Sequence, residues 1–134
     1  MNTAPEYLFV YGTLMQGFDN DFAKKLHQFS TYKTNGSFPG MLYAVSWYPG
    51  AIYIPDAPKR VFGEIYELSA HADLLPELDE YEDVNEDEKL SLYLRQIVPV
   101  TLENGLVMNC WTYLYNQTVA GLEEVENGDF RNFS

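Results

Sequence analysis

Apolar and aromatic residues recur along the chain in short runs that are typical of buried β-strands. These runs lie at residues 6–11, 41–47, 51–54, 61–68, 92–102 and 106–115. Pro49-Gly50 predicts a turn between the second and third runs, and Asn104-Gly105 predicts a hairpin between the last two, because Asn-Gly favours tight hairpin turns. Gly63 lies inside its run, which indicates a β-bulge or a close approach of another backbone.

Helical periodicity is found in fewer segments. "DFAKKLHQF" repeats apolar residues at i, i+4 and i+7 after Asp19 or Asn20, either of which can cap a helix. Residues 68–84 begin with the capping candidate Ser69, and residues 118–128 are expected to form a short helix that ends at its last glycine. The chain of 134 residues suits one domain, residues 1–134, of the α+β class. We expect a small mixed β-barrel or a strongly curled sheet, with short peripheral helices.

Charge and cysteine content exclude several classes of function. The chain has 20 acidic and 8 basic residues, a formal charge of −12, which disfavours nucleic acid and anionic membrane surfaces as partners. The only cysteine, Cys110, lies in an apolar stretch and is expected to be a buried hydrophobic residue. Neither a signal peptide nor an apolar run of membrane-spanning length is visible, so we expect a cytoplasmic protein.

The sequence predicts no metal and no cofactor. His27 and His71 lie far apart, and neither has Cys, Asp or Glu partners at the spacing of a zinc site. Surface positions on helices are therefore expected for both. The chain lacks the Gly-x-Ser-x-Gly motif of a serine hydrolase, and the glycines of "YGTLMQG" are wrongly spaced for a phosphate-binding loop.

Helical phase singles out one carboxylate in "LLPELDEYED". At about 100° per residue, Glu82 falls on the same face as Leu78, whereas Glu80 points nearly opposite and Asp83 lies well off this face. Pro76 makes the phase of the preceding leucines unreliable, but the relation of Leu78 to Glu82 lies after the proline. A glutamate in an apolar position has a raised pKa, which suits a general acid/base, or else it belongs to a buried ion pair. Phase alone leaves both interpretations open.

A second candidate feature is "VYGTLMQG", where an apolar strand stops abruptly. Gly12 has no side chain, so the backbone there can approach a ligand closely. Backbone N–H groups in such a turn suit a carboxylate or a developing oxyanion. Together with one glutamate, they would be enough for an intramolecular acyl transfer without a cofactor.

The chain resembles the gamma-glutamylcyclotransferase-like family, in particular the small branch that includes gamma-glutamylamine cyclotransferases. The motifs that carry the resemblance occur in the family's order between about residues 7 and 115: "LFVYGTLMQG", "WYPGAI", "VFGEIYEL", "LLPELDEYE", "LYLRQIVPV" and "CWTYLY". The resemblance implies a small β-barrel surrounded by short helices, with a cavity at the mouth of the barrel.

The resemblance also implies roles for individual residues. It assigns backbone contacts with the substrate to four consecutive residues, Tyr11, Gly12, Thr13 and Leu14. Glu82 corresponds to the family's acid/base, the same residue that helical phase selects. Tyr113 corresponds to an aromatic residue of the last core strand and either lines the pocket or packs between strands. Tyr93 and Arg95 match a "YxR" motif, for which strand packing and surface support are the simpler interpretation, above all for Arg95.

The reaction implied by the resemblance is cyclisation of a gamma-glutamyl amine or gamma-glutamyl amino acid to 5-oxoproline, with release of the amine. The partner is then a small gamma-glutamyl molecule. A non-catalytic module that binds small ligands, or a hydrolase with the same pocket, is the alternative.

Two departures from the family leave the substrate open. Asp83 stands where the family often has glycine, and its charge is expected to raise the pKa of Glu82; residues 82–91 are unusually acidic. Met15-Gln16 also replaces the basic residue that often follows the Tyr-Gly-Thr-Leu motif.

Overall fold

The structure is a computed structural model that describes residues 7–68, 74–84 and 87–132. Within these ranges the elements follow one another in this order: β1 (Tyr7–Val10), α1 (Asp21–Phe29), β2 (Ser30–Ala44), β3 (Pro49–Tyr53), β4 (Arg60–Leu68), α2 (Leu74–Tyr81), the 3-10 helix η1 (Glu88–Leu90), β5 (Tyr93–Leu102), β6 (Val107–Tyr115), β7 (Glu123–Glu124) and the 3-10 helix η2 (Phe130–Asn132). Ser69 and His71 lie outside the described residues.

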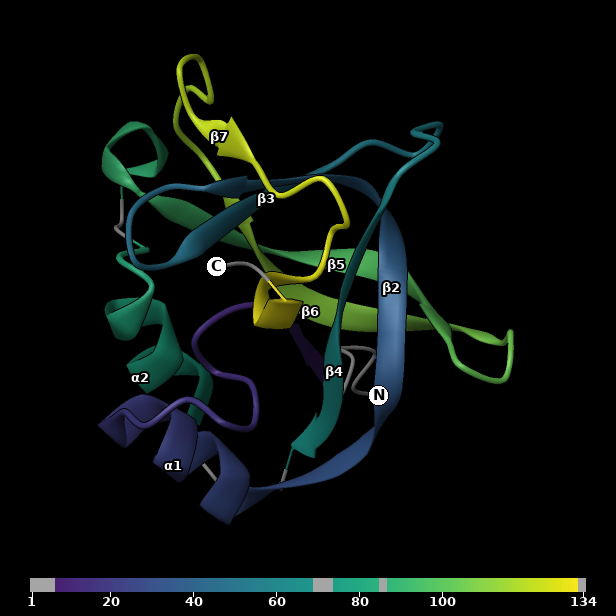
Figure 1. Cartoon of the computed structure of the whole chain (residues 1–134). Coiled ribbons are helices and arrows are strands. Elements are labelled where there is room, and N and C mark those ends of the chain that lie inside the picture. The colour runs from purple at the N-terminus through teal and green to yellow at the C-terminus, as the bar shows by residue number, and fades with distance from the viewer. Residues whose placement is uncertain (1–6, 69–73, 85–86, 133–134) are drawn as a thin grey trace.

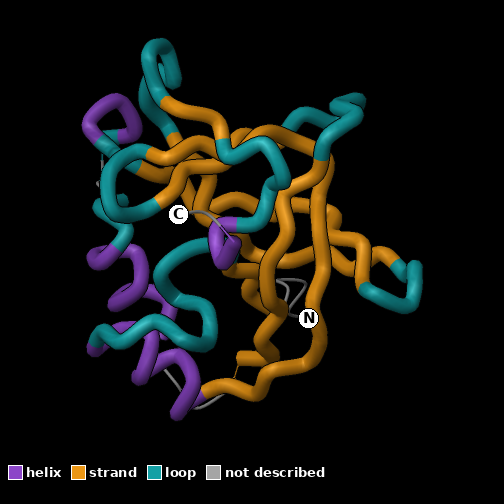
Figure 2. Tube along the Cα trace, viewed as in Figure 1, coloured by secondary structure: helices purple, strands orange, loops and turns teal. Residues whose placement is uncertain are grey.

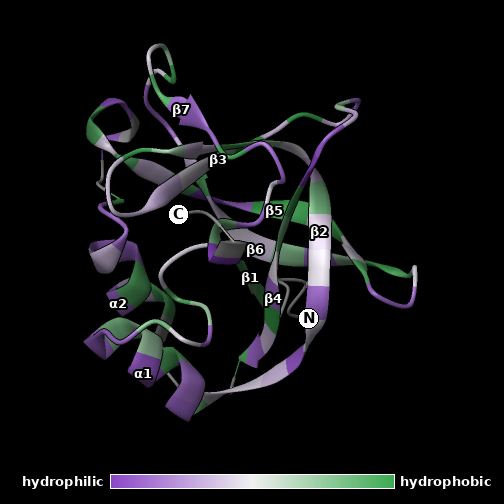
Figure 3. Ribbon diagram, viewed as in Figure 1, coloured by the Kyte–Doolittle hydropathy of each residue, from purple (hydrophilic) through white to green (hydrophobic). Residues whose placement is uncertain are grey.

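Five strands form a closed barrel in the order β2-β4-β1-β6-β5, and pairing of β2 with β5 closes it. β1 and β6 run parallel, whereas the other barrel pairs are antiparallel. α1 and α2 lie together on one side of the barrel (Figures 1 and 2). Both carry hydrophobic and hydrophilic stretches (Figure 3), as expected for helices that bury one face. This is the small mixed barrel with short peripheral helices that the sequence predicts.

β1 is buried on both of its faces. Leu8 and Val10 pack with the buried residues of the helices, whereas Phe9 and the following Tyr11 point into the barrel. All four side chains are at most 5% exposed. Burying such a side chain stabilises a fold by about 1.5–3 kcal/mol, which explains why this segment is apolar at every position rather than at alternate ones. Cys110 lies in the barrel interior, as predicted, and burial raises the pKa of its thiol to about 12.

β2 is much longer than the sequence indicates. The predicted strand begins at residue 41, but β2 begins at Ser30, and its first part pairs with β4. Residues 30–40 are mostly polar and contain Asn35-Gly36 and Pro39-Gly40, which are typical turn pairs. Pairing of these residues with three other strands, β3, β4 and β5, overrides these local preferences. Pro49-Gly50, predicted to be a turn, instead begins β3.

Gly63 and the Asn104-Gly105 turn match their predictions. A Cβ atom on Gly63 would lie 2.2 Å from the carbonyl oxygen of Val10, so β1 and β4 can pair closely only because position 63 has no side chain. Gly105 has a φ of 90° and joins β5 to β6, a conformation that favours glycine.

The helix predictions have mixed outcomes. α1 is confirmed, with the Asn20 side chain accepting the Ala23 N–H at 2.8 Å as its cap. The predicted helix over residues 68–84 is confirmed only over α2: Leu68 belongs to β4, α2 ends at Tyr81, and residues 69–73 lie outside the described ranges. The predicted helix over residues 118–128 is wrong, because this segment forms turns and the short strand β7, which pairs with β2. Gly121, with a φ of 83°, interrupts any helix there. No helix in the described part of the chain is long and apolar enough to cross a membrane.

Candidate functional site

Glu82 follows the last residue of α2, where the backbone is held firmly. Its N–H bonds to the carbonyl of the fully buried Leu78 at 2.9 Å, so the helical phase that selects Glu82 is correct. Pro76 lies in the first turn of α2, where its missing N–H does not interrupt the helix. Asp83 has a φ of 58°, and the N–H groups of Asp83 and Val84 return to carbonyls of the last turn at 3.1 and 2.9 Å. This is a Schellman motif, whose left-handed position usually carries glycine and here carries aspartate.

A pocket lies between the end of α2 and the barrel. Its empty volume is about 330 Å³, a figure that includes space open to solvent. The lining residues come from β1 and the following loop (Phe9 to Leu14), the start of β3 (Tyr48 and Pro49), the end of α2 (Glu82), and β5 and β6 (Tyr93 and Tyr113). All the residues that the sequence nominates for a site therefore lie around one cavity. Tyr48 and Pro49, from "WYPGAI", are lining residues that the sequence did not single out.

Glu82 provides the only carboxylate among the described residues that line the pocket. Burial raises the pKa of this carboxyl from 4.5 to about 8. Burial alone accounts for the rise, so the expected contribution from the charge of Asp83 is not found. Within the described ranges, no hydrogen bond or ion pair engages the Glu82 side chain, and its oxygens are not sealed from solvent. The arrangement therefore favours a chemical role for Glu82 over a buried ion pair.

Hydrogen bonds hold the backbone of the loop after β1, which lines the pocket, in a fixed orientation. Three successive carbonyls are engaged: Gly12 by the N–H of Met15 at 3.0 Å, Thr13 by Asn20 Nδ2 at 2.8 Å and Leu14 by His27 Nε2 at 2.8 Å. In a trans peptide the N–H points opposite to the preceding carbonyl, so the N–H groups of Thr13 and Leu14 point away from Met15 and Asn20. Neither N–H group has an acceptor within the described residues.

Two tyrosines of the pocket, Tyr11 and Tyr93, use their hydroxyl groups to connect neighbouring strands. Tyr11 donates to the carbonyl of Tyr113 at 2.6 Å and accepts the N–H of Ala51 at 3.1 Å. Tyr93 donates to the carbonyl of Pro49. Burial raises the pKa of Tyr11 and Tyr93 far above the ordinary value, so both stay neutral. Tyr11 therefore offers the pocket its ring and backbone rather than its hydroxyl.

Asp79 connects α2 to the barrel. Its carboxylate accepts hydrogen bonds from Arg95 at 2.7 and 3.0 Å and from the Tyr113 hydroxyl at 2.7 Å. The Arg95 guanidinium also lies over the ring of Trp111, 4.5 Å from its centroid. Asp79 precedes Glu82 by less than one turn, so this cluster holds the helix end and Tyr113 in fixed relative positions. The sequence treats Asp79 as solvated surface, and no local signal distinguishes it from its neighbours.

Replacing Asp79 by alanine is expected to lower the free energy of unfolding by about 1–3 kcal/mol, because Arg95 and Tyr113 both lose a partly buried charged partner. Urea unfolding of the variant measures the loss. Glu80→Ala is the matched control, since Glu80 is exposed on the same helix and should change stability by less than about 0.5 kcal/mol. Equal losses for the two variants would contradict the role of Asp79.

Comparison with known proteins identifies the family. The model of the family described as "Gamma-glutamyl cyclotransferase, AIG2-like" matches residues 8–132. The chain belongs to this gamma-glutamyl cyclotransferase, AIG2-like family. A curated relative, "Putative gamma-glutamylcyclotransferase MJ1514" of Methanocaldococcus jannaschii, is 29% identical over 96% of the chain and 98% of its own length.

Solved structures share the fold of this family member. The crystal structure of an AIG2-like protein of Mus musculus superposes with a TM-score of 0.71 at 26% identity, covering 90% of the chain and 86% of the mouse protein. YkqA of Bacillus subtilis has a TM-score of 0.70 at 24% identity over 96% of the chain. The chain spans only 40% of YkqA, which therefore supports the fold alone. No group of three or more His, Cys, Asp or Glu side chains in the described ranges could hold a metal ion.

Proposed function

We propose that the protein cyclises a gamma-glutamyl amine or gamma-glutamyl amino acid to 5-oxoproline, with Glu82 as the general acid/base. The observation that carries the proposal is the Glu82 carboxyl, which has no hydrogen-bond or ion-pair partner among the described residues and lies in a pocket that Gly12 to Leu14 also line. Membership of the gamma-glutamyl cyclotransferase, AIG2-like family supports the same reaction.

In the proposed reaction the substrate supplies its own nucleophile. Glu82, as the carboxylate, takes a proton from the α-ammonium group, and the resulting amine attacks the γ-carbonyl to form the ring C–N bond. As the bond to the leaving nitrogen breaks, Glu82 returns its proton to that nitrogen. The ring nitrogen gives up a second proton, which ends on the leaving nitrogen. The leaving group therefore departs as an ammonium ion, and the ring keeps one N–H. No oxidant, metal or cofactor is needed for this balance.

In the proposed reaction, the residues that line the pocket have different tasks. The N–H groups of Thr13 and Leu14 can hold the substrate's carboxylate or the oxyanion that forms at the γ-carbon. The aromatic rings of Tyr48, Tyr93 and Tyr113 narrow the space in which the flexible glutamyl chain can fold. Holding the amine beside the carbonyl can lower an intramolecular barrier by about 7–11 kcal/mol, which makes positioning the main source of rate.

The direct test is incubation with a panel of gamma-glutamyl amines and gamma-glutamyl amino acids, followed by chromatographic analysis of the products. We expect 5-oxoproline and the released amine in equal amounts. Free glutamate in place of 5-oxoproline would instead indicate hydrolysis by water that Glu82 activates. Binding of these compounds without turnover would indicate the non-catalytic ligand-binding module.

The rate is expected to depend on pH through Glu82. Only the ionised carboxylate can accept the proton, and burial raises its pKa to about 8, so kcat/KM should rise with pH and level off above about pH 8. The profile is measured between about pH 6 and pH 10, and the pKa of the substrate's α-ammonium group is determined separately to correct for its own titration. A corrected profile that is flat over this range would contradict a base at Glu82.

A further inference from the structure

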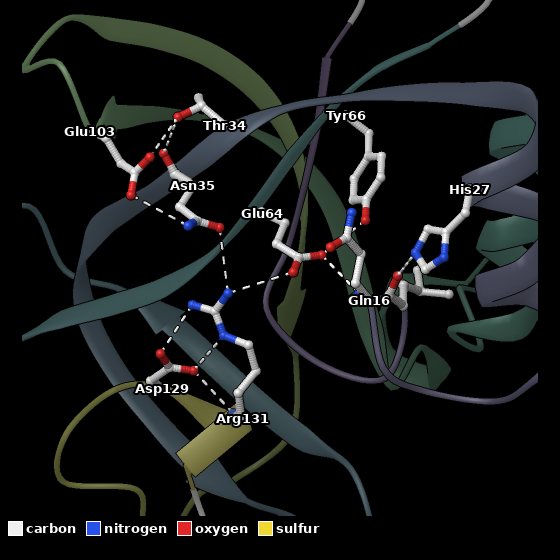
Figure 4. Close-up of polar contacts among 10 residues, drawn as sticks. Gln16, His27, Thr34, Asn35, Glu64, Tyr66, Glu103, Asp129 and Arg131 are labelled. Carbon is white, nitrogen blue, oxygen red and sulfur yellow. Dashed lines mark hydrogen bonds and ion pairs between the residues drawn. The ribbon is translucent and has the colours of Figure 1, made fainter.

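A buried carboxylate lies behind the loop that the proposed function assigns to substrate binding. Glu64, on β4, is only 4% exposed. Its Oε1 accepts the backbone N–H of Gln16 at 2.9 Å and the hydroxyl of Tyr66 at 2.9 Å (Figure 4). Gln16 is two residues beyond Leu14, so Glu64 holds the point at which the loop leaves the pocket.

An arginine near the C-terminal end, Arg131, lies beside the Glu64 carboxylate. Nη1 of Arg131, in η2, lies 3.5 Å from Oε2 of Glu64. Asp129 orients the guanidinium through two hydrogen bonds, at 2.8 and 3.0 Å, and Asn35 Oδ1 accepts a third at 3.4 Å (Figure 4). Such a planar, two-bond contact fixes the direction of the arginine as well as its position.

A second contact between the same two segments supports this coupling. The ring of Phe130, next to Arg131, stacks on that of Phe18, which follows Gln16 in the loop, with centroids 6.0 Å apart and an interplanar angle of 16°. η2 therefore touches the loop directly through an aromatic pair and indirectly through Glu64. Neither contact involves a residue that lines the pocket.

We propose that Glu64 and Arg131 are positioning residues for substrate binding, through which the C-terminal segment sets the orientation of the Gly12 to Leu14 backbone; this inference rests on the proposed function. A carboxylate at position 64 gives the Gln16 N–H a charge-assisted hydrogen bond, roughly twice as strong as a neutral one. A buried carboxylate without a nearby cation would be costly, and Arg131 lowers that cost. Removal of either partner loosens the loop where it leaves the pocket.

The experiment measures steady-state kinetics on gamma-glutamyl substrates for Glu64→Ala, Glu64→Gln and Arg131→Gln. We expect kcat/KM to fall about tenfold in Glu64→Ala, the factor that corresponds to the loss of one such hydrogen bond. Glu64→Gln keeps an acceptor oxygen and should recover most of the loss. If the loop holds the substrate's carboxylate, the loss of kcat/KM appears as a higher KM. If the loop holds the oxyanion, the loss appears as a lower kcat. Either result supports positioning.

Arg131→Gln keeps the test decisive if Glu64→Ala does not fold, because Arg131 is partly exposed and its loss is expected to cost about threefold in kcat/KM. The matched control is Glu124→Gln, which breaks the Lys59–Glu124 pair that ties β7 to the barrel without touching the loop. The control should keep wild-type kinetics. Folded Glu64 and Arg131 variants with wild-type kcat/KM, or a control with the same loss, would overturn the proposal.

Amide hydrogen exchange separates this inference from the proposed function. In Glu64→Ala the Gln16 amide should exchange about tenfold faster than in the wild type, while amides of the β5–β6 pair stay unchanged. If the wild type turns over no gamma-glutamyl compound, the proposed function fails, and this measurement still tests the hold of Glu64 on the loop. An unchanged Gln16 exchange rate would overturn that hold whatever the activity.

Discussion

Replacing Glu82 by glutamine is expected to lower kcat by about a thousandfold or more, with the substrate still bound, because the amide cannot exchange the proton that the proposed reaction moves twice. Steady-state measurement of 5-oxoproline release gives the rate, and calorimetric titration with substrate gives the binding. The matched control is Asp83→Asn. It removes the neighbouring charge, and asparagine tolerates the left-handed conformation, with φ at 58°, that ends α2. Near-normal turnover in Glu82→Gln would show that the acid/base is another group.

The stability of Glu82→Gln shows whether its loss of activity results from a folding defect. The pKa of Glu82 is about 8 in the folded protein and 4.5 in its ordinary state, so between these values the folded protein binds more protons than the unfolded chain. The free energy of unfolding of the wild type therefore falls as the pH rises from about 4.5 to about 8, and Glu82 adds no further loss above that. Glu82→Gln removes this loss, so at pH values above about 8 it should unfold at a higher temperature than the wild type. Loss of activity with unchanged or greater stability separates chemistry from folding.

Replacing Gly12 by valine is expected to lower kcat/KM by about a hundredfold, because a misplacement of about 1 Å in a substrate-positioning group can have that effect. A Cβ atom at position 12 would lie 2.9 Å from two ring carbons of Pro49, so either the loop or the opposite wall of the pocket must move. Kinetics on the gamma-glutamyl substrate identified by product analysis measure the change, and circular dichroism checks the fold.

Conservative changes at the next two positions serve as controls for Gly12→Val. Thr13→Ser keeps the hydroxyl that pairs with the Tyr81 hydroxyl at 2.7 Å, and Leu14→Met keeps the volume of a side chain that is 2% exposed. Both should retain activity within about threefold of the wild type, since the backbone N–H groups stay in place. Larger losses at Thr13 or Leu14 than at Gly12 would mean that side chains, not the backbone, contact the substrate.

The strands that the sequence identifies are those whose local pattern and tertiary environment agree. β1, β4, β5 and β6 carry apolar or alternating residues because they face the barrel interior, the helices or both. The first part of β2 is largely polar and contains turn-forming residues, and β7 consists of two glutamates, so their extended conformation depends on partners that are distant in sequence. Local preference is therefore a poor guide for the strands that close or extend this barrel.

The residues of the site also differ in whether the sequence alone identifies them. Helical phase selects Glu82 from the chain alone, because a carboxylate on an apolar face is a local anomaly. The turn at Gly12 is a candidate because its strand stops abruptly, whereas the substrate contacts of Tyr11 to Leu14 and of Tyr113 depend on the family resemblance. The structure brings these residues to the same pocket, while their roles stay predictions. The sequence does not identify Asp79 or Glu64, because an acidic residue is expected on the solvated surface unless its distant partner is known. Arg95 and Arg131 are those partners.

The central place of β1 has a consequence for how the protein is made. β1 is synthesised first, yet it pairs with β4 and with β6, where Leu8 and Phe9 lie opposite Trp111 and Thr112. During translation, β1 cannot pair with β6 until most of the chain has been synthesised. Contacts of such long sequence separation slow folding and leave an unpaired hydrophobic strand exposed in the nascent chain. We therefore expect ribosome-bound chains that end before β6 to be open to protease and to chaperones, with protection only once β6 has been released.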